Sequence, residues 1–328
     1  MLKKIKVTPL AAESLGVRSM CTLIETSDIK ILLDAGISLC PWRFGLPPHP
    51  IEFQTIIKLR KRIAEAAERV EIVTISHYHF DHHTPSFEDW LVNWTDKEST
   101  ARQIYKEKRV LLKNPRESIN PSQRQRAWLF QKTGGKFAKT LEAADGKTFV
   151  FGNDTTLHFS EAVTHGPENG MLGWVIIAEI KCSDETFMFA PDVQGPISNR
   201  ATELIRAARP DVLMVGGPPL YLRGFKADEK QLQQGLKNLM SLAETVPLLI
   251  IEHHILRDAE WHDKIRQVYE AANKTGNIIN TAAEFIGQDN VFLEARRTQL
   301  YEEMPPSKDF ERWMRETSEA KSVKKPPV

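Results

Sequence analysis

IVTISHYHFDHH, residues 72–83, joins a short apolar run to four histidines and one aspartate. The apolar residues Ile72 to Ile75 predict a buried strand, so the polar side chains leave one strand end together. Packing does not explain this density, because neighbouring imidazoles repel one another when protonated and need partners when neutral. A divalent metal supplies such a partner, and Zn²⁺ accepts both imidazole nitrogen and carboxylate oxygen. A solvated histidine-rich loop is the alternative, which the placement at a strand end disfavours.

Alternating strand and helix patterns surround this stretch and predict an α/β fold. Upstream, strand-like runs at 19–25 and 29–33 indicate a hairpin, and apolar spacing over 51–70 predicts a helix. Downstream, short strands with polar turns indicate an antiparallel meander at 148–151, 155–159, 174–180 and 186–189. Helix and strand patterns then alternate as in covered layers, at 199–208, 211–215, 228–243, 248–251 and 259–272.

We expect a single domain over residues 1–300, because a chain of 328 residues can bury a continuous core and no internal repeat is visible. Within it, residues 84–139 are expected to form a basic, partly helical insertion. Residues 301–328 are expected to form a C-terminal helix followed by a flexible tail.

The composition excludes several classes of protein. Hydrophobic residues make up 41% and charged residues 27% of the chain, which is far from disordered or fibrous compositions. The three cysteines have unrelated spacings, so neither a disulfide framework nor a thiolate zinc cage is indicated. Apolar stretches are too short to span a bilayer, and the first residues lack the apolar centre of a signal peptide. A cytoplasmic protein without membrane association is therefore expected.

The motif His77-x-His79-x-Asp81-His82 after a buried strand resembles the signature of the metallo-β-lactamase-fold hydrolases. The resemblance extends along most of the chain and is greatest to a mainly archaeal branch of that superfamily. It implies an αββα four-layer sandwich with a helical insertion, and it names a metal site rather than a substrate. The metal ligands that it implies are His77, His79, Asp81, His82, His165, Asp192 and His253.

In that superfamily the ligands hold two metals. By resemblance, His165 in Thr164-His165-Gly166 completes the group of the first two histidines, and the last histidine completes the Asp-His pair. Asp192, which follows the strand pattern 186–189, is implied to bridge both metals.

The last ligand falls in the pair His253-His254. His253 is favoured because it comes first after the apolar strand and its glutamate, while His254 stays an alternative ligand and a candidate catalytic residue. Asp34, at the end of an early strand, resembles an acid that orients a ligand, with a strand-end turn residue as the alternative interpretation.

This ligand set predicts a hydrolase. Two metals that share a water lower its pKa and hold the hydroxide in line with a carbonyl carbon or phosphorus. We therefore expect a metal-bound hydroxide to attack an ester-like bond, with Asp81 as a catalytic residue that orients it. Imidazole-rich ligation favours two zinc ions, with iron or manganese as alternatives. The redox flavodiiron proteins carry a carboxylate where His79 stands, which disfavours that branch.

The basic segment Lys97 to Lys139 bears on the substrate. It holds twelve Lys and Arg against three Glu, interleaved with aromatic residues, a mixture that favours a small-molecule or nucleic-acid phosphoester. A solvated pair of charged helices is the other interpretation, and residues 122–126 could instead clamp a small phosphate or carboxylate. Phosphoester hydrolysis is the first hypothesis. A thioester or lactone hydrolase of the hydroxyacylglutathione hydrolase type and a nucleic-acid-binding protein with a structural metal site are the alternatives.

Overall fold

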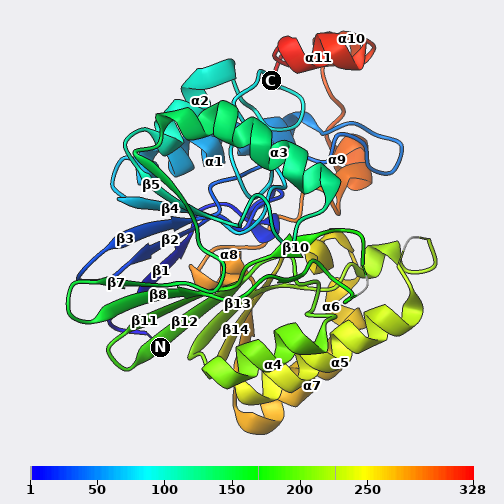
Figure 1. Cartoon of the computed structure of the whole chain (residues 1–328). Helices are drawn as coiled ribbons and strands as arrows, with labels where there is room; N and C mark the ends of the chain where they lie inside the picture. The colour runs from blue at the N-terminus through cyan, green and yellow to red at the C-terminus, as the bar shows by residue number, and fades with distance from the viewer. Residues whose placement is uncertain (1, 169, 226) are drawn as a thin grey trace.

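Two β-sheets lie face to face between two layers of helices in the computed structural model, which describes residues 2–168, 170–225 and 227–328 (Figure 1). Helices α1, α2 and α3 cover the outer face of the first sheet, and α4, α5 and α7 cover the outer face of the second (Figure 1). The predicted four-layer αββα sandwich is confirmed. Within the described ranges, no helix combines the length and apolar character needed to cross a bilayer.

The first sheet has the strand order β1-β2-β3-β4-β5-β6. Strands β1 to β3 pair antiparallel, and β3 to β6 pair parallel. The predicted early hairpin is therefore present, and it is followed by parallel layers. The strands are β1 (Lys6–Pro9), β2 (Thr22–Glu25), β3 (Lys30–Leu33), β4 (Ile72–Ile75), β5 (Arg109–Leu112) and β6 (Thr140–Ala143).

The second sheet has the order β15-β14-β13-β12-β11-β8-β7. Its meander half pairs antiparallel from β7 to β12, and its other half pairs parallel from β12 to β15. A separate two-stranded ribbon lies beside it, formed by β9 (Val163–Thr164) and β10 (Trp174–Val175). The sheet strands are β7 (Thr148–Phe151), β8 (Thr155–Phe159), β11 (Ala178–Cys182), β12 (Glu185–Ala190), β13 (Val212–Gly216), β14 (Leu248–Glu252) and β15 (Ile278–Asn280).

The helices follow the expected alternation closely. Helix α1 begins with a capping box between His49 and Glu52, and its apolar spacing buries one face on the first sheet. The longer helices are α1 (Pro50–Ala67), α2 (Lys97–Tyr105), α3 (Pro121–Lys132), α4 (Asn199–Ala208), α5 (Glu229–Thr245) and α7 (Arg266–Thr275). The shorter ones are α6 (Trp261–Lys264), α8 (Ala282–Phe285), α9 (Arg297–Glu303), α10 (Lys308–Met314) and α11 (Ser318–Val323).

Side-chain alternation along the strands divides the core into two parts. On β12, Phe187 and Phe189 point into the core between the sheets, whereas Met188 and Ala190 belong to the cluster that contains residues of α4, α5 and α7. Strands β13 and β14 alternate in the same way. These strands are buried on both faces, which explains why they read as continuous apolar runs.

The segment 84–139 differs from the expected insertion. It contains β5, which pairs with β4 and β6 and so forms part of the first sheet, as well as α2 and α3 (Figure 1). Basic residues on both sides of the buried run Val110–Leu112 mask this strand in the sequence. The segment is therefore an integral part of the sandwich that also supplies two helices.

Two further segments differ in detail from the prediction. The helix expected over 259–272 divides at Ile265, whose backbone angles of −111° and 19° are not helical. The C-terminal segment holds α10 and also α11, which lies within the expected tail. Trp313 of α10 is buried edge-to-face against Phe53 of α1, so the sandwich anchors this segment.

Candidate metal centre

The predicted ligands come together at the carboxyl ends of strands from both sheets. His77 follows β4 after one residue, Asp192 follows β12 after one residue, and His253 directly follows β14. His165 comes directly after β9. Parallel strands place the residues after their carboxyl ends at one edge of a sheet, so distant parts of the chain meet here.

A first group of side chains surrounds one carboxylate oxygen. Asp192 Oδ2 lies 3.0 Å from His77 Nε2, 3.0 Å from His165 Nε2 and 3.7 Å from His79 Nδ1. The ligand atoms of these four residues all lie within 4.8 Å of one another. Three imidazole nitrogens and one carboxylate form a donor set that suits a zinc-like cation.

A second group lies beside the first. His253 Nε2 is 3.4 Å from Asp81 Oδ2, 3.4 Å from His82 Nε2 and 3.0 Å from Asp192 Oδ1. His82 Nε2 is in turn 3.3 Å from Asp192 Oδ2. Asp192 therefore faces the first group and the second, which is the arrangement that a bridging carboxylate requires.

Hydrogen bonding within the centre is incomplete. Among the described residues, Asp192 Oδ1 and His254 Nε2 are buried polar atoms without a hydrogen-bond partner. They lie 3.1 Å apart, but they do not meet the angular requirements of a hydrogen bond. Buried polar atoms without partners are costly, and a cation held by Asp192 would satisfy its oxygen. The residues present therefore fit a metal centre.

The two carboxylates of the centre stay ionised. Burial favours the neutral acid, but the imidazoles of His253 and His165 hold the pKa of Asp192 well below its usual range. Burial acts in the same way on Asp81, where the neighbouring imidazoles of His253, 3.4 Å away, and of His82 keep its pKa well below its usual range. Two buried negative charges thus lie among the imidazoles, and positive charge must compensate them.

Asp34 orients two of the imidazoles. Its Oδ2 accepts a hydrogen bond from His82 Nδ1 over 2.8 Å, which leaves the His82 Nε2 lone pair directed into the centre. Its Oδ1 accepts from the Ser76 N–H over 2.8 Å, and the Ser76 hydroxyl donates to Oδ2. The Ser76 hydroxyl oxygen then accepts from His77 Nδ1 over 3.0 Å, so His77 Nε2 also presents a lone pair. This geometry favours the ligand-orienting interpretation of Asp34.

His253 and His254 differ in their environment. Arg257 Nη1 lies 2.9 Å from His254 Nδ1 and donates to it, because guanidinium has no acceptor atoms. Burial, followed by the charge of Arg257, holds the pKa of His254 well below its usual range, so the imidazole is neutral. The proton of a neutral ring that accepts at Nδ1 is on Nε2. His254 is thus arranged as a hydrogen-bond donor, whereas His253 contacts both carboxylates of the second group.

Arg257 also borders the second group. Its Nη2 lies 3.2 Å from His253 Nε2 and 3.8 Å from Asp81 Oδ2. Its Nε donates to Glu13 Oε1 over 2.5 Å, which offsets the guanidinium charge. A cation in the second group would have the charged Arg257 guanidinium as a neighbour, which would repel it.

The backbone at the centre is unusual. Asp34, Asp192 and His253 each have a positive φ, of 47°, 50° and 68° respectively. Such left-handed conformations are unfavourable for residues with a Cβ and concentrate at functional sites. Gly36 has a different role, because a Cβ on it would lie 2.3 Å from His82 N and 2.2 Å from His83 N. Only glycine lets the chain after β3 pass this close to the histidine-rich loop.

His83, the last histidine of the loop, does not face the metal centre. Burial lowers its pKa to about 3, and its Nδ1 donates to the His79 carbonyl over 2.9 Å. Its ring packs edge-to-face on Phe130 of α3. His83 is a neutral packing residue that connects the loop to α3.

A cavity of about 380 Å³ opens onto the centre. The predicted site residues that line it are His79, Asp81, His165, Asp192 and His254. The His79 side chain is 28% exposed, whereas those of His77 and His82 are fully buried, so His79 is the imidazole that a substrate reaches most directly.

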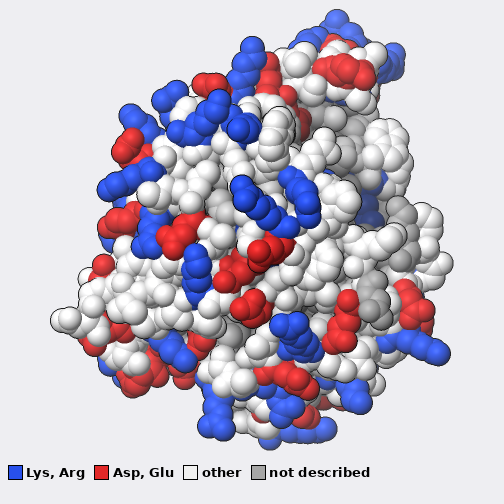
Figure 2. Space-filling view, viewed as in Figure 1, with Lys and Arg blue, Asp and Glu red and all other residues white. Residues whose placement is uncertain are grey.

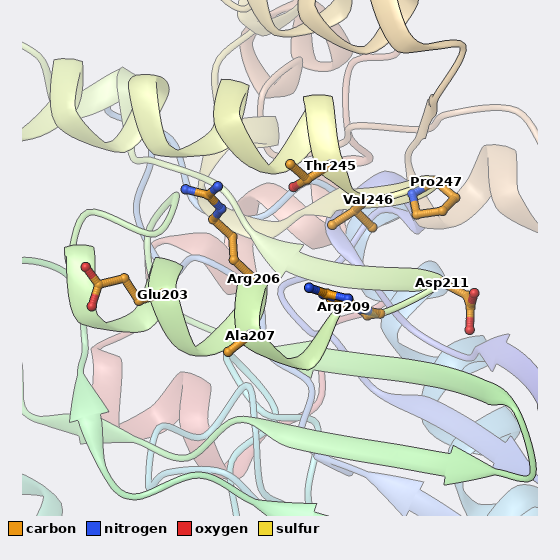
Figure 3. Close-up of a pocket in the computed structure, with 9 residues that line it drawn as sticks. Glu203, Arg206, Ala207, Arg209, Asp211, Thr245, Val246 and Pro247 are labelled. Atoms are coloured by element: carbon orange, nitrogen blue, oxygen red, sulfur yellow. The ribbon is translucent and has the colours of Figure 1, made fainter.

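A separate cavity of about 730 Å³ lies where α4 and α5 end (Figure 3). Its lining includes Arg206, Arg209, Glu203 and Asp211, with both signs of charge. It contains neither histidine nor cysteine among its lining residues, so the ligand chemistry of the metal centre is not repeated there.

Several residues of the site were missed by the sequence interpretation. Arg257 comes four residues after His253 and three after His254. This helical spacing was the signal that the sequence offered. Glu13 contacts it from 244 positions away, for which the sequence has no local signal. Ser76 lies within the histidine-rich stretch 72–83, but its link between Asp34 and His77 depends on the fold.

The chain is similar to known proteins over most of its length. It is 42% identical over 296 residues to the UPF0282 protein MK0213 of Methanopyrus kandleri, covering 90% of this chain and 99% of that one. It is 43% identical over 298 residues to a UPF0282 protein of Thermococcus gammatolerans, covering 90% and 95%. Among solved structures, Tm1679, a metal-dependent hydrolase of the beta-lactamase superfamily, has a TM-score of 0.44 and 10% identity, with 85% of this chain and 96% of that chain covered.

Residues 15–83, which include β2 to β4 and the histidine-rich loop, match the Metallo-beta-lactamase superfamily. The resemblance that the histidine motif indicated is confirmed by this match and by the relatives. The chain belongs to the UPF0282 family of proteins, with the fold of the metallo-β-lactamase superfamily.

Proposed function

We propose that this protein is a dinuclear metal-dependent hydrolase that cleaves an ester-like bond, with zinc as the favoured metal and a phosphoester as the favoured substrate. The observation that supports this most directly is the Asp192 carboxylate, which contacts both groups: Oδ2 lies 3.0 Å from His77 and from His165, and Oδ1 lies 3.0 Å from His253. His77, His79 and His165 would hold one cation, and Asp81, His82 and His253 the other.

The metals would supply a nucleophile at neutral pH and stabilise the charge of the transition state. The protein's own contribution is to orient the ligands and to place a proton donor. Asp34 and Ser76 fix the His77 and His82 rings, so that their Nε2 lone pairs face the centre. His254 lines the cavity, and its Nε2–H, 3.1 Å from Asp192 Oδ1, would donate to a leaving oxygen held at that carboxylate.

The proposed reaction is an ordinary hydrolysis. The oxygen of water joins phosphorus, and the bond from phosphorus to the leaving oxygen breaks. His254 Nε2 gives its proton to the leaving oxygen and regains one from the attacking water. Asp81, whose side chain is 16% exposed at the cavity, is placed to accept a hydrogen bond from that water.

The surface of the basic segment favours a small substrate over a nucleic acid. Figure 2 shows Lys and Arg side chains over the region of α2 and α3, with Asp and Glu side chains among them. Arg109 pairs with Glu142 over 2.8 Å, and Arg102 pairs with Glu98 over 3.9 Å. Pairs of this kind reduce the charge that a phosphate backbone would meet.

The test is a substrate panel with protein loaded separately with Zn²⁺, Mn²⁺ or Fe²⁺. We expect turnover of bis(p-nitrophenyl) phosphate that disappears in His165→Ala and persists in His158→Ala, which changes a histidine outside the cluster. If only a glutathione thioester or a lactone is turned over, the substrate class is a thioester or a lactone rather than a phosphoester. Salt-dependent nucleic-acid binding that survives His165→Ala, without any hydrolysis, would contradict the enzyme and favour a binding protein.

A further inference from the structure

The cavity at the metal centre contains three arginines, and their pairing differs. Arg18 donates to both oxygens of Glu294, with Nε and Nη2 distances of 2.6 Å each. Arg257 donates to Glu13. In the described part of the chain, no carboxylate forms an ion pair with Arg126, whose guanidinium carbon instead lies 5.2 Å from the centre of the Phe80 ring. Arg126 is thus the cation of the cavity whose charge is not neutralised by an acid.

Helix α3, which carries Arg126, is anchored before and after this residue. The Gln123 side chain donates to the Trp174 carbonyl over 3.0 Å and accepts from the Trp174 N–H over 3.1 Å, which ties α3 to β10. One turn after Arg126, Phe130 packs against His83 and Tyr105, with ring centres 5.7 Å and 5.0 Å apart. The helix backbone is therefore anchored before and after Arg126, so that binding a ligand requires only the Arg126 side chain to become ordered.

Arg126 and the metal centre share the same cavity. Both Arg126 and Asp81 line it, and Phe80, on which the guanidinium rests, is the residue before Asp81. A guanidinium presents several N–H donors in one plane and binds phosphate or carboxylate oxygens in pairs. Arg124, two residues away on α3, is exposed, and it is absent from the cavity lining.

The cavity also has apolar lining residues. Leu39, Pro41, Leu172 and Leu222 line it, and Trp42 at 63% and Phe44 at 54% are exposed on the loop that continues from Pro41. Exposed large apolar side chains beside a polar site indicate contact with an apolar part of a ligand. A volume of about 380 Å³ suits a small molecule.

We propose that the substrate is a small organic phosphoester, whose anionic oxygens are bound by Arg126 and whose apolar organic group lies against Leu39, Pro41, Leu172 and Leu222. This inference rests on the proposed hydrolysis, and it names the substrate class and a specificity-determining residue for it.

The experiment measures the binding of phenyl phosphate and of inorganic phosphate to the metal-loaded protein by calorimetry. Arg126→Gln is compared with Arg124→Gln as the matched control on the same helix, and metal content is measured for each. We expect Arg126→Gln to weaken phenyl phosphate binding by about tenfold or more with unchanged metal content, and Arg124→Gln to change it by less than about twofold. Phenyl phosphate should bind the unchanged protein about tenfold more tightly than inorganic phosphate, because the ring buries apolar area.

The possible outcomes separate this inference from the proposed function. Equal affinities in Arg126→Gln and the unchanged protein, or no binding of phenyl phosphate at all, would overturn the role of Arg126. Equal affinities for the phenyl ester and for inorganic phosphate would contradict the proposed contact between the organic group and the apolar lining residues. Phosphodiester turnover that does not depend on Arg126 would support the proposed hydrolase function but contradict the proposed substrate site. Arg126-dependent binding without turnover of any ester would support the anion-binding site and contradict the proposed hydrolase function.

Discussion

Asp34 Oδ2 and His82 Nδ1 are joined by a hydrogen bond of 2.8 Å, although 48 positions separate the two residues in the chain. This bond fixes which nitrogen of His82 carries the proton and directs the other into the metal centre. We predict that Asp34→Asn weakens metal binding by about 10- to 100-fold, because the amide no longer provides the second acceptor oxygen that the imidazole and Ser76 require.

Competition with a chelator, followed by far-ultraviolet circular dichroism, measures this effect and checks that the fold persists. Asp154→Asn, on the exposed turn between β7 and β8, is the control. An unchanged metal affinity in Asp34→Asn would leave Asp34 as a turn residue only.

The two neighbouring histidines are predicted to behave differently. His254→Ala should lower kcat by about 100-fold or more while metal content stays at the level of the unchanged protein, because we propose that His254 donates a proton and that His253 is the ligand, although both belong to a candidate ligand group with Asp192. His253→Ala should instead lose metal from the second group. Elemental analysis beside steady-state kinetics distinguishes the two. Loss of metal in His254→Ala would make His254 the ligand and His253 its neighbour.

A buried ion pair anchors the C-terminal part of the chain to the sandwich. Arg297 Nε and Nη2 each lie 2.7 Å from a Glu52 oxygen, and both side chains are almost fully buried. Arg297→Ala leaves Glu52 buried without its cation, so we predict a loss of about 3–5 kcal/mol in the free energy of unfolding. Arg266→Ala, which breaks an exposed pair with Asp263, should cost less than about 1 kcal/mol in the same urea titration. Similar losses in both variants would contradict the importance of burial.

The pair of Arg18 and Glu294 predicts a dependence of stability on pH. Burial favours the neutral carboxyl, but Arg18 lowers the pKa of Glu294 to about 2. A carboxyl whose pKa is lower in the folded state contributes stability above its unfolded value, about 4.3, and loses it as the pH falls toward 2. The difference in unfolding free energy between the unchanged protein and Glu294→Gln should therefore be largest near neutral pH and shrink below about pH 4. Chemical denaturation at several pH values measures it, and a pH-independent difference would show that Glu294 acts through packing alone.

Much of the fold was predictable because its signals are local. The apolar runs at β4, β13 and β14 are buried on both faces and therefore have no polar alternation to obscure them. Strand β5 was hidden because basic residues adjoin its short apolar run. The break at Ile265 depends on tertiary packing, since the side chain itself is fully compatible with a helix.

The seven candidate metal ligands were indicated by a dense motif and by a family resemblance, and the structure brings their side chains together in adjoining groups. The residues that support these ligands were harder to predict from the sequence. The contact of Glu13 with Arg257 joins η1 (Glu13–Leu15) to η4 (His253–Arg257), which the topology alone brings together. The same is true of Arg126, whose importance over its neighbour Arg124 follows only from the position of α3 over the cavity.

Metal stoichiometry tests the central claim most directly. Protein reconstituted with Zn²⁺ and freed of excess metal should contain about two zinc ions per chain by inductively coupled plasma mass spectrometry. When a chelator is added, the ion of the second group, Asp81, His82 and His253, should be removed first. The charged Arg257 guanidinium lies 3.2 Å from His253 Nε2 and would repel that ion. Asp192→Asn, which alters the carboxylate that faces both groups, should retain at most one. A chain that keeps no zinc, manganese or iron after reconstitution, or an Asp192→Asn variant that keeps both ions, would contradict a bridged dinuclear centre.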